Sequence, residues 1–155
     1  MKKAIIICGF PGVGKTSAAN NRRSILDAES SAFSYKWDTE PPFGRERNSE
    51  FPKNYIDFLQ ENESEYDVVL ASSHRVVRDE LKYAGMQYII VAPKRELKNE
   101  YLIRYLQRGS DIDFIELLND KWDEFLTDIE NDGAPVIWLS SKEYLSDVLG
   151  RAYVG

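Results

Sequence analysis

The chain of 155 residues has a single cysteine, Cys8, and a single histidine, His74. One cysteine excludes an intramolecular disulfide framework and a cysteine-rich zinc site, and one histidine excludes a metal centre built from several histidines. The sparse use of cysteine agrees with a reducing compartment, and we expect a cytoplasmic protein.

Long hydrophobic runs are also absent. The apolar run nearest the start, Ala4–Cys8, has five residues, which is shorter than the apolar core of a signal peptide. No run approaches the roughly 20 residues that a membrane helix needs. We therefore expect neither a targeting segment nor a membrane partner.

Positive charge is in short supply, because 20 Lys and Arg stand against 26 Asp and Glu, for a formal net charge of −6. A protein that coats duplex nucleic acid needs an excess of basic residues to displace counterions, so we expect no duplex partner. The remaining composition, 43% hydrophobic and 30% charged, is that of an ordinary soluble globular chain. The length fits one domain covering residues 1–155.

Short apolar runs alternate with helical patterns along the chain. The runs that predict strands are Ala4–Cys8, Ile25–Leu26, Asp67–Ala71, Tyr88–Ala92 and Pro135–Leu139. Helical patterns start near Pro52, Val76, Lys94, Ile112 and Lys142, and Ser110-Asp111-Ile112-Asp113 resembles a capping box ahead of the longest one. This alternation predicts an α/β fold with a parallel sheet and helices on both faces.

A complete phosphate-loop motif, G-x-x-x-x-G-K-[ST], follows the first predicted strand. Its glycines let the backbone N–H groups point at phosphate oxygens, and the helix that follows adds its positive end. Lys15 is expected to reach the β- and γ-phosphates, and the Thr16 hydroxyl to bind Mg²⁺. We therefore expect ATP with Mg²⁺ as ligands. The residues predicted to bind them are Gly9, Gly12, Val13, Gly14, Lys15, Thr16 and Ser17.

Two large classes of phosphate-loop protein do not fit the sequence. The switch GTPases read their base with Asn-Lys-x-Asp, which the nearest string, Asn119–Asp123, does not match. Motor and remodelling ATPases carry an acidic residue after an apolar strand, whereas here the third predicted strand is followed by Ser72-Ser73-His74-Arg75. Small kinases remain.

The N-terminal phosphate loop, the length, the strand–helix order and an arginine-bearing helix before a long helix resemble the nucleoside monophosphate kinases. Adenylate, thymidylate, gluconate and shikimate kinases belong to the same structural group. The resemblance implies a three-layer P-loop NTPase fold whose five-stranded sheet has the order 2-3-1-4-5. It further implies an acceptor-binding segment at about residues 28–62 and a short lid-like region at about 94–112.

The resemblance also implies roles for residues beyond the loop. Asp27, with Glu29, resembles the acidic pair of shikimate-type kinases, in which the first acid contacts the metal-bound water or the acceptor hydroxyl. Asp27 is thus expected at the metal and in catalysis, with helix capping or a solvated turn as the alternative. Arg75 stands where these kinases often hold the acceptor phosphate. For the neighbouring His74 we favour an ordinary loop position.

Arg104 and Arg108 are four residues apart and therefore lie on one helix face. They resemble the lid arginines that neutralise charge on the transferring phosphoryl group. The alternative is a solvated face whose arginines pair with Glu96 and Glu100. In the acceptor segment, aromatic rings and guanidinium groups suit a nucleoside monophosphate, although the rings can equally form a local hydrophobic cluster. The acceptor-binding residues predicted there are Tyr35, Arg45 and Arg47.

The sequence therefore predicts an enzyme that moves the γ-phosphoryl group of ATP to a small acceptor, for which we expect a nucleoside or deoxynucleoside monophosphate. A small metabolite of the gluconate or shikimate kind, or the 5′-hydroxyl end of a nucleic acid, remains an alternative acceptor. A nucleotide-binding regulatory protein with little turnover is an alternative of another class, supported by the missing carboxylate after the third strand. The oligomeric state stays open.

Overall fold

The structure is a computed structural model that describes residues 3–19, 24–28 and 50–154. Its centre is a sheet of five strands, all parallel, in the order β2-β3-β1-β4-β5, so the predicted order is confirmed. The strands are β1 (Ile5–Gly9), β2 (Ile25–Asp27), β3 (Val68–Ser72), β4 (Ile89–Pro93) and β5 (Val136–Leu139).

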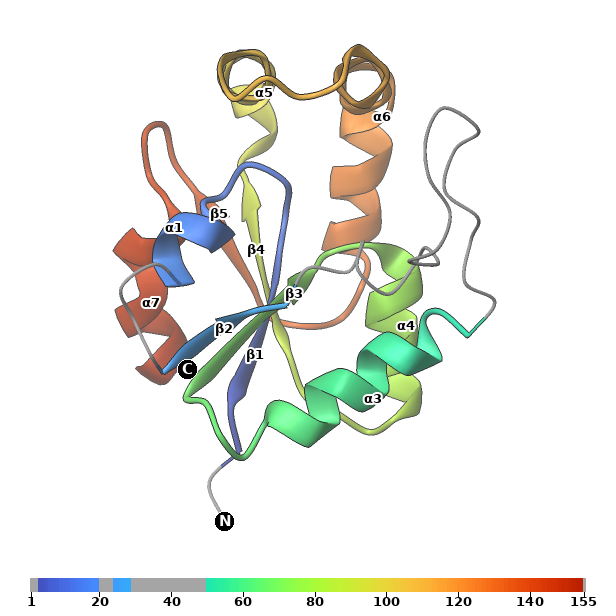
Figure 1. Cartoon of the computed structure of the whole chain (residues 1–155). Helices are drawn as coiled ribbons and strands as arrows, with labels where there is room; N and C mark the ends of the chain where they lie inside the picture. Colours follow the sequence, from blue (N-terminus) through green and yellow to red (C-terminus); the bar gives the residue numbers. More distant parts are fainter. Residues whose placement is uncertain (1–2, 20–23, 29–49, 155) are drawn as a thin grey trace.

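Helices cover both faces of this sheet, as predicted. Figure 1 shows α1 and α7 on one face and α3 and α4 on the other, which gives a three-layer α/β fold. In the same view α5 lies beyond the carboxyl end of β4 and beside the upper end of α6. The helices are α1 (Lys15–Ala19), α3 (Lys53–Asn62), α4 (Arg75–Tyr83), η1 (Arg95–Leu97), α5 (Lys98–Gln107), α6 (Ile112–Glu130) and α7 (Leu145–Val154).

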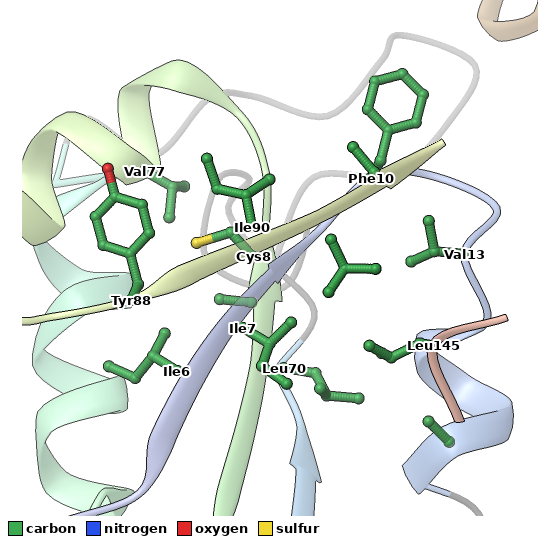
Figure 2. Packing of buried hydrophobic residues seen from close by; sticks show 14 of the residues in the cluster. Ile6, Ile7, Cys8, Phe10, Val13, Leu70, Val77, Tyr88, Ile90 and Leu145 are labelled. Atoms are coloured by element: carbon green, nitrogen blue, oxygen red, sulfur yellow. The ribbon is translucent and has the colours of Figure 1, made fainter. Parts of the chain in front are cut away.

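The central strand β1 is apolar along its length because it is covered on both sides. It pairs with β3 and β4, and from Ile6 to Gly9 its residues are buried. Figure 2 shows Cys8 directed toward the side of Val77 and Tyr88, whereas Val13 and Leu145 lie on the opposite side. Burial raises the pKa of the Cys8 thiol to about 12, so this cysteine is a neutral core residue at physiological pH.

A buried ion network joins α4, β4 and the end of α6. Arg78 is 3% exposed and donates to Asp128, Asp132 and, at 2.8 Å, to the carbonyl of Ser73. The hydroxyl of Tyr88 donates to the other oxygen of Asp132 at 2.7 Å. All three guanidinium nitrogens of Arg78 are thus engaged, and this network has no counterpart in the sequence-based predictions.

The start of the last helix and the capping of α6 differ from the predictions. The last helix begins at Leu145 rather than near Lys142, because residues 140–144 form a turn in which Lys142 has a left-handed φ of 63°. The predicted capping box is wrong: the N-cap residue of α6 is Asp111, without a side-chain cap, and the Ser110 hydroxyl accepts a hydrogen bond from Arg108 instead. In the described parts of the chain, no helix has the length and apolar character to cross a membrane.

Candidate functional site

The phosphate loop connects the carboxyl end of β1 to α1. Its backbone is anchored to the sheet by the N–H of Phe10, which donates to the carbonyl of Val91 at 2.9 Å. Gly12 and Gly14 have φ of 91° and 92°, a region that L side chains rarely adopt, so the sequence places glycine where the turn needs it. The N–H of Val13 donates to the Phe10 carbonyl at 3.2 Å and its side chain is buried, so Val13 supports the loop from beneath.

A cavity of about 640 Å³ opens beside this loop. It lies at the carboxyl ends of the strands, where open α/β sheets bind their ligands. Its walls come from the loop and α1, the segment after β2, the end of β3 with the segment after it, α5 with the residue that follows it, the first turn of α6, and the segment ahead of α7. The described lining residues are Gly9, Phe10, Pro11, Gly12, Gly14, Lys15, Thr16, Ser17, Ala28, Ser72, His74, Arg104, Gln107, Arg108, Phe114 and Tyr144.

The charge of this lining is opposite in sign to that of the whole chain. Three of the described lining residues are basic, namely Lys15, Arg104 and Arg108, and none of them is acidic. The chain as a whole has a net charge of −6. A concave site that gathers one sign of charge concentrates ligands of the other, so the cavity favours an anion.

Lys15 lies at the mouth of the loop. Its ammonium donates to the carbonyl of Gly9 at 2.8 Å. A Cβ atom on Gly9 would lie 2.9 Å from Cδ of Lys15, so the first glycine of the motif leaves room for the lysine stem to cross the loop. The ammonium is thereby kept beside the backbone of the loop.

Thr16 and Asp27 meet at the start of α1. The Thr16 hydroxyl donates to Oδ2 of Asp27 at 3.1 Å. The other oxygen, Oδ1, is buried and has no hydrogen-bond partner within the described residues. Asp27 ends β2 and pairs with the hydroxyl across from it, which disfavours the helix-cap alternative.

This pair fits a hydrated divalent cation. Mg²⁺ is usually bound by one or two oxygen ligands from the protein, with water and phosphate oxygens completing its shell. Thr16 supplies a hydroxyl and Asp27 a buried carboxylate oxygen that lacks a partner. Within the described residues, this site included, no group of three or more His, Cys, Asp and Glu side chains is placed to bind a metal.

Arg104 of α5 is tied directly to the phosphate loop. Its guanidinium donates to the carbonyl of Gly12 at 2.9 Å and to Glu100 at 3.0 Å. It lies between two rings, with its central carbon 4.2 Å from the ring centre of Tyr101 and 4.1 Å from that of Tyr144. The pairing with Glu100 expected of a plain charged helix face is present, and so is a contact with the site.

Arg108, one turn later, is attached more loosely. It lies over the rings of Tyr105 and Phe114, at 5.0 and 5.7 Å, and donates through Nε to the hydroxyl of Ser110 at 2.9 Å. None of these partners is charged, and the side chain lines the cavity. Of Arg104 and Arg108, the latter, which caps the end of α5, is therefore the arginine with charge available to a ligand.

The segment after β3 presents different residues than expected. Arg75 is exposed, pairs with Asp79 at 3.6 Å and Asp128 at 3.5 Å, and is not among the lining residues. His74 and Ser72 are among them, joined by a 3.2 Å hydrogen bond from the His74 backbone N–H to the Ser72 hydroxyl. The structure thus brings together a group made of Lys15, Thr16, Asp27, Arg104 and Arg108, and Arg75 lies outside it.

Several predicted positions lie outside the described residues. The acceptor-binding residues Tyr35, Arg45 and Arg47 fall within residues 29–49, as does Glu29, the second acid of the predicted pair. Their roles stay predictions.

The tyrosines around the loop were missed as site residues. A Cβ atom on Gly12 would lie 2.9 Å from Cε1 of Tyr105 and 3.1 Å from Cδ2 of Tyr101. The Tyr105 hydroxyl donates to the carbonyl of Pro11 at 2.7 Å. Their spacing of four residues marked one helix face, but that signal alone does not distinguish a core face from one packed against a binding loop.

No family model matches the chain, and no curated protein matches it in sequence. The geometry of the site and the physical chemistry of its residues therefore carry the functional proposal.

Proposed function

We propose that the protein is an ATP-dependent phosphotransferase of the P-loop kinase type. The observation that carries this proposal is a cavity with three basic and no acidic lining side chains among those described, built around a complete phosphate loop with the Thr16–Asp27 pair beside it. We expect ATP as the donor, a nucleoside or deoxynucleoside monophosphate as the acceptor, and the cytoplasm as the location.

The loop and Lys15 would bind the phosphates of the donor. Glycines at the turn let backbone N–H groups approach phosphate oxygens, and the start of α1 adds the positive end of a helix. The ammonium of Lys15 would exchange its bond to Gly9 for the phosphate oxygens. Thr16 and Asp27 would bind Mg²⁺ directly or through water, and that ion supplies neutralisation of phosphate charge.

Arg104 of α5 and Arg108 at its C-terminal end would have different roles in the transfer. Phosphoryl transfer asks a protein mainly for positioning and for stabilisation of charge on the transferred group. Arg108, with uncharged partners, is suited to contact that group. Arg104, bonded to Gly12 and Glu100, is suited to fix the loop and to add positive potential from behind it.

One observation favours a second candidate acceptor, an alcohol. A hydroxyl acceptor must lose a proton as it attacks, whereas a phosphate acceptor is already ionised at neutral pH. Oδ1 of Asp27 is a buried carboxylate oxygen without a partner in the described residues, and it can accept such a proton. A small metabolite or the 5′-hydroxyl end of a nucleic acid is therefore the second candidate.

The test measures ADP formation from Mg·ATP with a panel of acceptors. The panel holds ribo- and deoxynucleoside monophosphates, gluconate, shikimate and 5′-hydroxyl oligonucleotides. Lys15→Ala serves as the blank, and Lys121→Ala, on the exposed side of α6, is the matched loss of one lysine away from the cavity. Stimulation by a monophosphate that disappears in Lys15→Ala and persists in Lys121→Ala supports the proposal.

The other outcomes separate the alternatives. Stimulation by an alcohol alone favours the second candidate and gives Asp27 the role of base. ATP binding without stimulation by any acceptor contradicts the phosphotransferase proposal and favours a regulatory nucleotide-binding protein.

A further inference from the structure

The turn between β5 and α7 is fastened to α5 by Glu100. The Ser141 hydroxyl donates to Oε1 of Glu100 at 2.5 Å, and the Lys142 backbone N–H donates to Oε2 at 2.9 Å. Lys142 has a φ of 63°, a conformation that costs free energy for a residue other than glycine and persists where its surroundings enforce it. Hydrogen bonds from Lys142 and Ser141 and the charge of Arg104 lower the pKa of Glu100, so it is ionised at neutral pH.

The conformation of this turn fixes the ring of Tyr144. The Tyr144 backbone N–H donates to Asp147 at 2.8 Å, and the N–H of Leu145 donates to the Val13 carbonyl in the phosphate loop at 2.8 Å. The ring lies against Arg104, and a Cβ atom on Gly14 would be 3.2 Å from its Cδ1 atom. The turn therefore holds the ring of Tyr144 at the edge of the phosphate loop.

This ring is open to a ligand. Tyr144 is 42% exposed and lines the cavity that contains Lys15 and Thr16. It ends a stack of three side chains, Tyr101, Arg104 and Tyr144, whose inner members are largely buried. An aromatic ring held in place on one side loses little freedom when a flat group stacks on it.

We propose that Tyr144 is the stacking platform for the base of the bound nucleotide and that Glu100 is the positioning residue that holds this platform in place. The inference rests on the proposed nucleotide-binding function and deepens it. The phosphate groups would occupy the loop, and the base would lie on the neighbouring ring.

The platform implies weak selection among bases. Stacking tolerates every base because each has a π face. Near Tyr144, the Ser141 hydroxyl and the Lys142 N–H are engaged by Glu100, and Arg104 is engaged by Gly12 and Glu100. We therefore expect ATP and GTP to bind within a few-fold of each other, and pyrimidine nucleotides more weakly because their rings are smaller.

The experiment compares a ligand that has a base with one that lacks it. Titration calorimetry on the full chain measures the affinity for Mg·ATP and for Mg·tripolyphosphate. We expect Tyr144→Ala to lower the affinity for Mg·ATP on the order of tenfold and to leave the affinity for Mg·tripolyphosphate unchanged. We expect Tyr144→Phe to keep both affinities. Tyr83→Ala is the matched control, because Tyr83 is 88% exposed on α4 and does not line the cavity.

Each other result overturns the inference in a recognisable way. An equal loss for both ligands means that Tyr144 supports the loop rather than the base. Unchanged or increased ATP affinity in Tyr144→Ala means that the base does not stack on the ring. More than tenfold selection between ATP and GTP means that a base-edge reader, and not the platform alone, binds the base. If the unmodified chain binds neither ligand, the proposed function fails as well.

Glu100→Gln tests the positioning role. As a single substitution, we expect it to lower the affinity for Mg·ATP several-fold and to leave the affinity for Mg·tripolyphosphate unchanged. In the Tyr144→Ala background, we expect it to have no further effect on either affinity. Additive effects of the two substitutions, or a loss of tripolyphosphate affinity, contradict a role that acts through Tyr144.

Discussion

Arg78 and Arg104 both connect secondary-structure elements, but their surroundings differ in a way that separates structure from function. Arg78 is 3% exposed and donates to two carboxylates and a backbone carbonyl. The Arg104 side chain is 12% exposed and has one carboxylate, one carbonyl and two ring faces as partners.

The difference shows whether a guanidinium group can still interact with a ligand once the protein has folded. Arg78 is surrounded by opposite charge and has no nitrogen left for a ligand, so its effect is on stability. Arg104 borders a cavity with Lys15 and Arg108 and without an acidic side chain among the described lining residues. Its charge therefore adds to the positive potential of the cavity and also contributes to packing.

The largest expected effect is on the Arg78 network. Arg78→Met removes the partner of two carboxylates, one of which, Asp132, is 1% exposed. Breaking a buried ion pair by removing one partner costs about 3–5 kcal/mol. Because Lys82 still pairs with Asp132 at 3.1 Å, we expect the free energy of unfolding to fall by an amount at the lower end of this range in urea titrations. The control is Arg95→Met, whose ion pairs with Asp123 and Glu130 are exposed, with an expected cost below about 1 kcal/mol. Equal effects of the two substitutions would contradict the structural role of Arg78.

Arg104→Met is expected to lower stability less than Arg78→Met does and, unlike that substitution, to lower the affinity for nucleotide. It removes the hydrogen bond to the Gly12 carbonyl and a positive charge from the cavity wall. We expect a loss of stability of about 1–2 kcal/mol and a drop on the order of tenfold in the affinity for both Mg·ATP and Mg·tripolyphosphate. Nucleotide affinity is also measured in Arg78→Met, under conditions in which this variant is folded. An equal loss of affinity there would contradict the idea that Arg78 acts on stability alone.

The carboxyl groups that pair with Arg78 and Arg104 also make the stability depend on pH. Burial raises the pKa of Asp132, but hydrogen bonds from Tyr88, Arg78 and Lys82 outweigh this effect and leave the pKa below its ordinary value of 3.8. A carboxyl group with a lowered pKa in the folded state stabilises the protein above its ordinary pKa, and this contribution is lost as the pH falls through the folded value. Stability should therefore fall with acid below about pH 4.

Urea titrations between pH 3 and 6 test this expectation. Asp132→Asn should flatten the acid dependence of the unfolding free energy, whatever its absolute stability. Glu100→Gln should flatten it as well, at a slightly higher pH, since the ordinary pKa of that carboxyl group is 4.5. An unchanged slope in Asp132→Asn would mean that this carboxyl group does not stabilise the fold through its charge.

The smallest expected effects come from two tyrosine hydroxyls, one in each region. Tyr88→Phe removes the bond to Asp132, and Tyr105→Phe removes the bond to the Pro11 carbonyl in the loop. Each should cost about 1 kcal/mol of stability. Tyr105→Phe should in addition weaken Mg·ATP binding a few-fold, whereas Tyr88→Phe should leave it unchanged, and equal binding losses would contradict the separation of the two regions.

The strands and the phosphate loop were predictable because their signals are local. Each strand contains an apolar run, which in β2 is only Ile25–Leu26, and the motif from Gly9 to Thr16 is contiguous. The order of the strands came from the resemblance, since apolar runs alone do not specify neighbours. The hydrogen bond between Thr16 and Asp27 brings together the two residues that were expected at the metal.

The rest depends on contacts between residues far apart in the sequence. Arg104 and Gly12 are 92 positions apart, and Lys142 and Glu100 are 42 apart. The late start of α7 follows from the second contact, because Glu100 stabilises the left-handed conformation of Lys142. Nothing in the local pattern distinguishes Arg75, which lies outside the cavity, from Arg104, which lines it.

The packing around Gly12 and Val13 has a consequence for the order in which the molecule is assembled. The loop precedes α5 and α7 in the sequence by about 90 and 130 residues, yet the Tyr105 hydroxyl donates to the Pro11 carbonyl and the N–H of Leu145 donates to the Val13 carbonyl. Bringing such distant segments together costs loop-closure entropy that local contacts do not offset. Binding competence should therefore appear late in folding, after the last helix has docked, even though the motif itself is contiguous.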